Sequence, residues 1–361
     1  MEKTTRQDSR MAIRKNCGQN YIFVVLHFNL FGLAKQATSR THQIKRRIAK
    51  LLVSRTTRML KILKGVFLAA FAGCCWGSMA VAAQYLFTNC GFEARHLTTL
   101  RLIGAGVLLL ALQAAFGGFQ SILKPFKEKR NIRDVLIYGV GVLLIQYTFF
   151  LAIEQSNAGT AAIMVGVGPL FIIGYLAICK HRKPVPKEFF CLFLAISGVS
   201  LVVTKGNFES LDFVSTGAFW GLLSSAFGAF CTVQPKNVIS RVGVSNVVGW
   251  GMVVGGSIAC LFTNPFAMDV HWTLPSVLCY FQIIAFGTVA AFWCYLKSTE
   301  YVIPSITAIL GSFEPLSAVA LSVIILGATF NSYELLGATA ILANMLILAW
   351  PSKDTESLTA N

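Results

Sequence analysis

From residue 65 onward, the sequence alternates apolar runs of about membrane-spanning length with short polar joints. We delimit ten such runs, at about 65–87, 97–116, 135–153, 158–179, 188–204, 216–234, 246–263, 276–296, 304–327 and 333–350. Hydrophobic residues make up 55% of the chain and charged residues only 13%, whereas soluble domains carry about 25% charged residues. This composition excludes a soluble enzyme and an intrinsically disordered protein. It predicts an all-α polytopic membrane protein with ten transmembrane helices.

The basic residues test this number of spans, because cytoplasmic joints collect Lys and Arg. If the N-terminus is cytoplasmic, 28 of the 31 basic residues fall on the cytoplasmic side. The outer joints hold only Arg95 and Lys205, and Arg101 lies inside the second run. One span more or fewer would scramble this pattern. We therefore expect both termini to be cytoplasmic and the protein to lie in the plasma (inner) membrane.

A basic extension precedes the apolar part, since residues 1–58 hold 13 Lys or Arg and only two acids. Four interpretations are open. The extension is upstream translation from a mis-assigned start, with Met59 as the true start, or a basic, disordered segment lying on anionic lipid. It is otherwise an organelle transit peptide or a nucleic-acid-binding arm, which the lack of interleaved aromatic residues disfavours. Residues 351–361 are expected to form a cytoplasmic C-terminal tail.

The two halves of the apolar part resemble each other. The pattern Gly-x-x-Trp-Gly occurs at 73–77 and again at 217–221, 144 residues apart. Three further pairs share an offset of 146 residues: Glu154 with Glu300, Pro169 with Pro315, and Glu188 with Glu334. These matches divide the chain into five-helix repeats over 59–204 and 205–350. Because five spans reverse the direction of the chain, the second repeat is predicted to be inverted, as in secondary transporters.

The Trp-Gly of the first span, Arg101 in the second and the Glu-Pro at 314–315 in the ninth add to this five-plus-five layout. Together they resemble the drug/metabolite transporter (DMT) superfamily, specifically its EamA-type ten-span proteins, over about residues 64–350. The resemblance implies a carrier of small metabolites, often amino acids, which it frequently exports. Many members place Gly-Glu just after spans four and nine, and this chain lacks that acid at both places.

Glu314 is the sharpest candidate for a functional residue, because an acid inside an apolar span costs several kcal/mol unless it is paired or faces water. Pro315 follows it, and Pro169 has the equivalent place in the first repeat. Both prolines predict a helix kink, since proline removes a backbone hydrogen bond. A carboxylate beside loosened backbone could bind a cationic group or take up a proton. The alternative is a structural role for Glu314, near the membrane surface or in an ion pair.

Five further residues complete the candidate substrate-binding or coupling site. Arg101 could bind a substrate carboxylate or pair with an acid such as Glu314, or its side chain could extend to the interface. Trp76 could line a central cavity or pack between helices. Polar side chains in apolar spans suggest a cavity suited to a small zwitterion, and the preferred wall residues are Gln146, Tyr147 and Tyr295.

The chain contains no hydrolase, zinc-protease, ATP-binding or dinucleotide-binding motif. We therefore expect no catalytic residue, no cofactor and no metal. The prediction is a secondary transporter that moves a small metabolite by alternating access, with an amino acid and export suggested by the resemblance. The alternatives are a non-transporting membrane scaffold or sensor and a membrane-embedded enzyme. The expected partners are a small-molecule substrate and the lipid bilayer, not nucleic acid, and a homodimer is left open.

Overall fold

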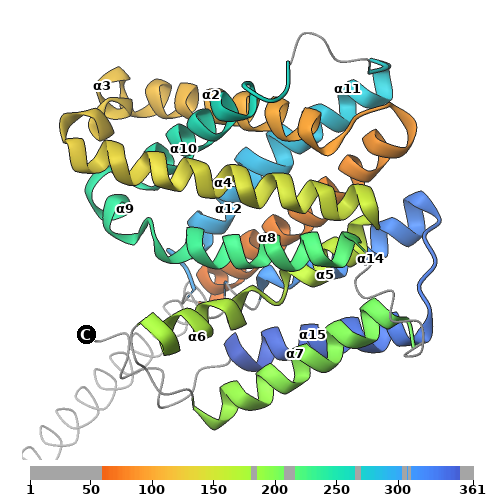
Figure 1. The fold of residues 1–361 in the computed structure, drawn as a ribbon. Helices are drawn as coiled ribbons and strands as arrows, with labels where there is room; N and C mark the ends of the chain where they lie inside the picture. Colours follow the sequence, from red (N-terminus) through yellow and green to blue (C-terminus); the bar gives the residue numbers. More distant parts are fainter. Residues whose placement is uncertain are drawn as a thin grey trace, which may run out of the picture. The chain divides into compact units, whose positions relative to one another are not determined.

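The computed structural model describes residues 59–179, 185–206, 216–264, 270–302, 307 and 310–349. The basic extension at 1–58 and the tail at 351–361 lie outside the described residues. Backbone contacts divide the chain into two units, Met1–Leu63 and Lys64–Asn361. The arrangement described below is that within the second unit, which Figure 1 shows in colours from orange to blue.

Every regular element in the described ranges is helical. The first is Met59–Asn89. The others are α2 (Ala94–Gly117), α3 (Phe119–Ile122), η1 (Lys124–Lys127), α4 (Lys129–Gln155), α5 (Ala158–Val165), α6 (Gly168–Cys179), α7 (Pro186–Thr204), α8 (Thr216–Val233), α9 (Lys236–Val242), α10 (Val244–Ala259), α11 (Leu274–Phe281), the π-helix η2 (Gln282–Ala290), α12 (Ala291–Ser298), α14 (Phe313–Leu326) and α15 (Ser332–Ala349).

Seven described helices are long and apolar enough to cross a membrane: Met59–Asn89, Ala94–Gly117, Lys129–Gln155, Ala158–Tyr175, Pro186–Thr204, Thr216–Val233 and Leu274–Tyr295. The pair Lys236–Val242 and Val244–Cys260, bent by 115°, makes an eighth candidate if it is one span. Two more apolar helices, Phe313–Leu326 and Ser332–Leu348, are shorter. The prediction of an all-α polytopic membrane protein is thereby confirmed, while the number of ten spans and the inverted repeat stay predictions.

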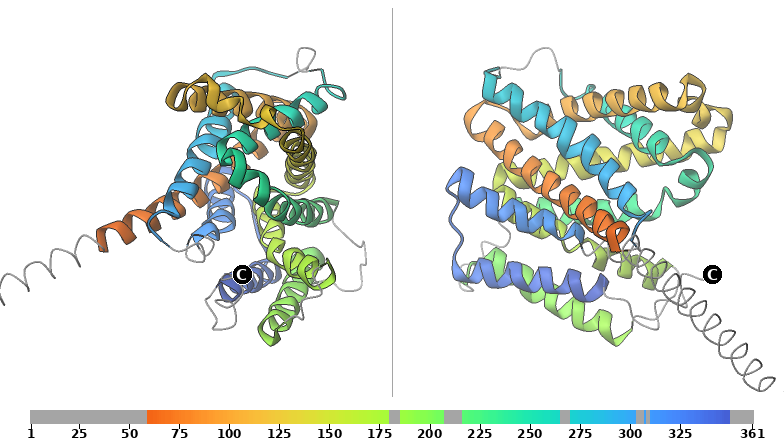
Figure 2. Two further views of the ribbon diagram at one scale, coloured as in Figure 1. Left: turned by 90° about the vertical axis from the view of Figure 1, so that its left-hand side faces the viewer. Right: turned by 180° about the vertical axis from the view of Figure 1, so that it is seen from behind.

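Four pairs of helices that are distant in the sequence pack side by side. Helix α2 packs against α10, α4 packs against both α8 and α10, and α7 packs against α15. Figure 1 shows α7 and α15 together in the lower part and α2 above α10, and Figure 2 shows the same neighbours from two other sides. The central part of the bundle therefore mixes helices from both halves of the chain.

Small residues let some of these helices approach closely, which is how helices associate in lipid. Where α7 crosses α15, a Cβ atom on Gly198 would lie 2.9 Å from the carbonyl oxygen of Gly337. A Cβ on Gly337 would lie 2.5 Å from the carbonyl oxygen of Gly198. Only glycine fits at either position without displacing the facing backbone.

Two glutamates that share the 146-residue offset begin their helices in the same way. The carboxylate of Glu188 accepts a hydrogen bond from the backbone N–H of Val185 (3.0 Å), just before α7. The carboxylate of Glu334 accepts one from the N–H of Asn331 (2.9 Å), whose own side chain accepts from the N–H of Glu334 (2.8 Å). Both contacts satisfy N–H groups that have no partner within the helix.

Four clusters of buried apolar side chains lie among the described residues, and the smallest joins the first helix to α12 through Ala72, Cys75, Ala291 and Cys294. The largest joins the first helix to α2, α4, α5, α14 and η2, and its fully buried members include Leu86, Phe150 and Ile283. The second joins α2, α4, α9 and α10, and the third joins α5, α7, α8 and α15. Trp76 and Tyr147 pack against the first cluster, and Trp76 and Tyr295 pack against the smallest.

Candidate functional site

Arg101 is buried in the bundle, with only 2% of its surface exposed. It lies on α2, and its guanidinium reaches two other helices. Its Nε donates to the hydroxyl of Thr288 on η2 (3.1 Å), and its Nη1 donates to the side-chain oxygen of Gln146 on α4. The guanidinium carbon also lies 5.5 Å from the centroid of the Phe150 ring, a cation–π distance. A charge held inside a membrane bundle in this way points to function, because its burial is unfavourable.

Glu314 lies in the first turn of α14, just after a break in the helical backbone at Ser312. Its carboxylate interacts electrostatically with Arg101 and Tyr295. Within the described residues, however, no hydrogen bond or ion pair joins it to either, and its side chain is only partly buried. The positive end of the helix dipole favours a carboxylate at this position. Glu314 is therefore a charge in reach of Arg101 but not neutralised by it.

Trp76 and Tyr295 form an aromatic wall beside this pair of charges. Their ring centroids are 5.3 Å apart, and Phe292 packs edge-on against Trp76 at 5.6 Å. Trp76 belongs to the first helix, whereas the other two rings belong to α12. Both Trp76 and Tyr295 are only partly buried.

The glycines of the first Gly-x-x-Trp-Gly pattern bring the first helix against the start of α14. A Cβ on Gly77 would lie 2.6 Å from the carbonyl oxygen of Glu314 and 2.7 Å from the backbone nitrogen of Ala318. A Cβ on Gly73 would lie 3.1 Å from the nitrogen of Glu314. This close crossing fixes the position of the turn that carries the carboxylate.

Both candidate prolines lie in the first turn of a half-helix. Helix α5 ends at Val165, and Pro169 is the second residue of α6. Pro315 is the third residue of α14. Proline is tolerated there because the first N–H groups of a helix have no partner within it. A short turn thus precedes each proline, at 166–167 and at 312, in equivalent parts of the two predicted repeats.

Tyr147 does not join the other candidates. It follows Gln146 on α4, but one residue turns a helix by about 100°. Its ring packs against the largest apolar cluster instead. Within the described residues, no hydrogen bond involves its hydroxyl. The structure thus gathers Trp76, Arg101, Gln146, Tyr295 and Glu314 around one centre and leaves Tyr147 at its apolar border.

The sequence analysis missed two residues of this centre, Thr288 and Phe150. The Thr288 hydroxyl accepts from Arg101 and also donates to the carbonyl of Ile283 (2.9 Å), five residues earlier in η2. The hydroxyl of a threonine in an apolar span usually donates a hydrogen bond only to a carbonyl of its own helix, so the sequence did not indicate a contact with Arg101. Within the described residues, no three His, Cys, Asp or Glu side chains gather as metal ligands.

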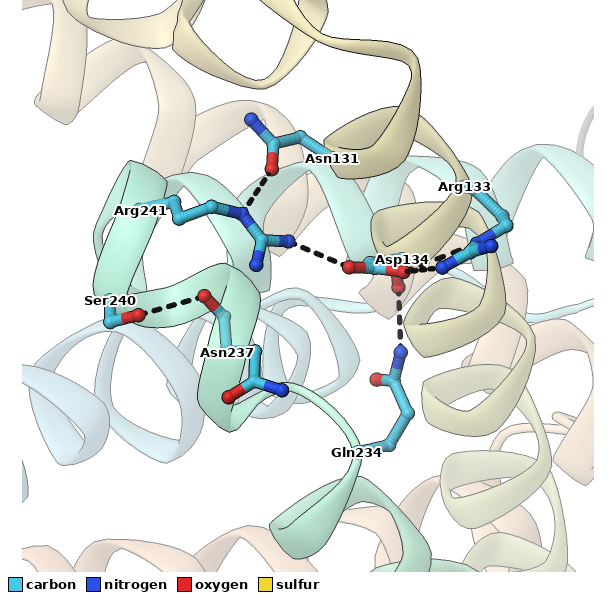
Figure 3. Close-up of polar contacts among 7 residues, drawn as sticks. All are labelled: Asn131, Arg133, Asp134, Gln234, Asn237, Ser240 and Arg241. Atoms are coloured by element: carbon cyan, nitrogen blue, oxygen red, sulfur yellow. Dashed lines mark hydrogen bonds and ion pairs between the residues drawn. The ribbon is translucent and has the colours of Figure 1, made fainter.

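A second polar cluster lies where the start of α4 meets α9, and Figure 3 shows it. Nη2 of Arg241 contacts the carboxylate of Asp134 at 2.7 Å, and its Nε donates to the side-chain oxygen of Asn131 at 2.6 Å. The side-chain amide of Gln234 donates to the carbonyl oxygen of Asp134 (3.0 Å). Arg133 reaches the same carboxylate from its exposed side (3.1 Å). The cluster ties α4 to the segment between α8 and α10.

Replacing Arg241 by Gln should lower the free energy of unfolding by about 1–3 kcal/mol, because it removes charge-assisted hydrogen bonds and leaves the buried Asn131 oxygen without its donor. The matched control is Arg133→Gln, which removes the exposed contact to the same carboxylate and should cost less than about 1 kcal/mol. Thermal unfolding of both purified variants measures the difference. Equal losses for the two variants would contradict this account.

A buried arginine and a nearby glutamate inside membrane-length apolar helices are typical of proteins that carry polar solutes across a membrane. The chain belongs to the EamA-like transporter family, whose family model matches residues 63–204 and again residues 215–350. This match confirms the family resemblance seen in the sequence.

Two relatives are named as transporters, and a solved structure is similar in fold. The "uncharacterized inner membrane transporter YicL" of Salmonella typhimurium is 32% identical over 291 residues, which are 80% of this chain and 96% of YicL. The "threonine/homoserine exporter RhtA" of Salmonella typhimurium is 25% identical over 296 residues, 80% of this chain and 92% of RhtA. One crystal structure matches with a TM-score of 0.56 and 14% identity, covering 78% of this chain and 96% of the other, and so shares the fold.

Proposed function

We propose that this membrane transporter is a secondary transporter that exports a small zwitterionic metabolite of the amino-acid class by alternating access. The observation that carries the proposal is the opposite charge of Arg101 and Glu314 around one buried centre. Trp76 and Tyr295 supply an aromatic wall beside them. A zwitterion brings one charge for each of the two residues and leaves the centre neutral when it binds.

The hydrogen bonds already present favour this assignment. A guanidinium has five N–H donors, and Arg101 uses two of them, for Thr288 and Gln146. The remaining donors suit a substrate carboxylate. Glu314 has no hydrogen-bond partner within the described residues, so its carboxylate is free for a substrate ammonium group. RhtA is named as an exporter of threonine and homoserine, which are zwitterions of this kind.

A proton on Glu314 offers a way to drive transport. A proton and a substrate ammonium group compete for the same carboxylate, so each can displace the other. Because the sequence contains no ATP-binding motif, an ion gradient is the energy source that fits the chain. Proton–substrate exchange at Glu314 is therefore part of the proposal.

The proposed architecture is ten spans in two inverted five-helix repeats. One family model matches both halves, and the bent pair with the two shorter apolar helices raises the candidate spans from seven to ten. Three packed pairs also support it: α2 with α10, α5 with α14 and α7 with α15. Each joins helices that occupy the same place in the two repeats, as a twofold pseudo-axis requires.

The positive-inside pattern and the relatives' names support an inner-membrane location with cytoplasmic termini.

The proposal is tested by flux measurements in proteoliposomes that contain the purified full chain. A pool of amino acids and other small metabolites is loaded, and efflux is followed with and without a pH gradient. We expect release of one or more amino acids, accelerated by a gradient that drives protons inward. A lack of flux for every pooled solute would overturn the transporter proposal in favour of a scaffold or sensor.

Glu314→Gln should reduce efflux at least about tenfold and remove its dependence on the pH gradient, because the amide neither takes up a proton nor attracts an ammonium group. The control is Glu128→Gln, which neutralises an exposed acid at the start of α4 and should leave efflux unchanged. Unaltered efflux and pH dependence in Glu314→Gln would refute the proposed role of this carboxylate.

A further inference from the structure

A groove of about 830 Å³ lies on the side of the bundle. Its walls are the second half of α2, the start of α10, and η2 with α12. Phe292, whose ring packs against Trp76, lines the groove, whereas Trp76, Arg101, Gln146, Tyr295 and Glu314 do not. Figure 2, right, shows η2 and α12 as the blue helix that runs obliquely past α2 and α10.

Helix packing explains why the groove is there. At its start, η2 is held close to α2, because a Cβ on Gly104 would lie 2.7 Å from the side chain of Ile284 and the Tyr280 hydroxyl donates to the carbonyl of Leu100 (3.1 Å). Further along the chain, contact with α2 weakens as α12 follows η2. The space between them is lined by apolar side chains such as Leu112. The volume of the groove is typical of small-molecule sites, which hold about 300–1,000 Å³.

Two charged residues line the groove at the α12 end. Nζ of Lys297 lies 2.7 Å from the carboxylate of Glu300, and the two side chains are 35% and 58% exposed. The hydrogen bond from Lys297 to Glu300 raises the pKa of Lys297, so the ammonium stays charged at neutral pH. An apolar trough thus ends in one positive and one negative group side by side.

We propose that this groove binds a phosphatidylethanolamine-type phospholipid, with an acyl chain along the apolar walls and the headgroup at the Lys297–Glu300 pair. The headgroup phosphate fits the ammonium of Lys297, and the headgroup amine fits the carboxylate of Glu300. The occupant follows from the surroundings, because an apolar groove on the side of a membrane bundle is filled by the acyl chains around it. This site goes beyond the proposed transport function and does not depend on it.

The charge pair discriminates among common phospholipids. Phosphatidylglycerol offers Lys297 its phosphate but has no cation for Glu300. Phosphatidylcholine carries a cation without an N–H group, so it cannot donate a hydrogen bond to that carboxylate. Phosphatidylethanolamine alone among these three satisfies both groups with hydrogen bonds.

The test is titration of the detergent-purified full chain with these three lipids, matched in acyl chains and followed by native mass spectrometry. We expect phosphatidylethanolamine to bind about tenfold more tightly than phosphatidylcholine, the difference that one charge-assisted hydrogen bond provides. Glycerophosphoethanolamine, which has the headgroup without chains, should not compete. Equal affinities, tightest binding of phosphatidylglycerol, or competition by the free headgroup would each overturn the proposal.

Two variants separate the headgroup from the chain. The double variant Lys297→Gln/Glu300→Gln should make the three lipids bind equally. Ala290→Phe fills the groove and should weaken binding of all three, whereas Ala111→Phe, on the exposed face of α2 outside the groove, should not. Thermal unfolding checks that each variant is folded. If Ala290→Phe does not fold, the double variant at the two exposed residues still tests the headgroup contacts. A preference for phosphatidylethanolamine that persists in the double variant refutes these contacts.

Discussion

Replacing Arg101 by Met should reduce transport about 100-fold while leaving the free energy of unfolding within about 1 kcal/mol of the parent value. The loss of transport follows because one or two charge-assisted hydrogen bonds to the substrate, each worth about 1.5–3 kcal/mol, disappear. Stability changes little because the variant also escapes the unfavourable burial of a charge whose hydrogen bonds within the described residues go to neutral groups. Met retains most of the apolar stem that packs beside Phe150.

Efflux from proteoliposomes and thermal unfolding measure the two parts of this expectation. The control is Arg95→Gln, which breaks an exposed ion pair with Glu93 and should change neither quantity appreciably. Arg101→Lys should be intermediate, because it keeps the charge but loses the planar fork of donors. Transport at the parent rate in Arg101→Met would contradict a role in substrate binding, and a chain that no longer folds would show that the residue is structural.

Gly77→Ala should lower the free energy of unfolding by about 1–3 kcal/mol and impair transport, because the added methyl group overpacks a backbone crossing. The new Cβ would meet the side chain of Ser317 and lie 2.6 Å from the carbonyl oxygen of Glu314. Relief requires a shift of the first turn of α14, which carries the Glu314 carboxylate. The two readouts should therefore change together.

The matched control is Gly228→Ala, in the interior of α8, where an added Cβ meets no atom within 4 Å. This variant should be as stable as the parent or slightly more stable, because alanine favours helix over glycine by about 1 kcal/mol. Thermal unfolding of both variants, with efflux measured in parallel, provides the comparison. A Gly77→Ala variant that is as stable and as active as Gly228→Ala would contradict the close crossing.

Ionisable residues in apolar spans were the part of the site that the sequence could predict. Arg101 and Glu314 stood out because a charge is rare there. Gln146 was selected as a polar wall residue, and the structure gives it a hydrogen bond with Arg101. Its neighbour Tyr147 was selected for the same reason but faces the apolar cluster, because polarity alone does not say where a side chain points.

Other features left no trace in the sequence. Asp134 and Arg241 are 107 residues apart, and nothing in either surrounding segment indicates that they meet. The π-helix has the same composition as an ordinary apolar span, so its hydrogen-bond pattern could not be foreseen. The offset of 146 residues, in contrast, could be recognised in the sequence. For one of its pairs, Glu188 and Glu334, the structure shows that both carboxylates cap the start of a helix in the same way.

The nine residues of η2 wind with more residues per turn than an α-helix. This segment therefore uses more residues per turn than the α-helices on either side of it. A difference of one residue in that winding corresponds to a turn of about 100° and a rise of about 1.5 Å in the helix that follows, α12. That helix carries Tyr295 at the aromatic wall and Lys297 at the groove, while Thr288, within the π-helical segment, holds Arg101. The winding of η2 thus sets both the direction in which Tyr295 meets Trp76 and the direction in which Lys297 meets the groove.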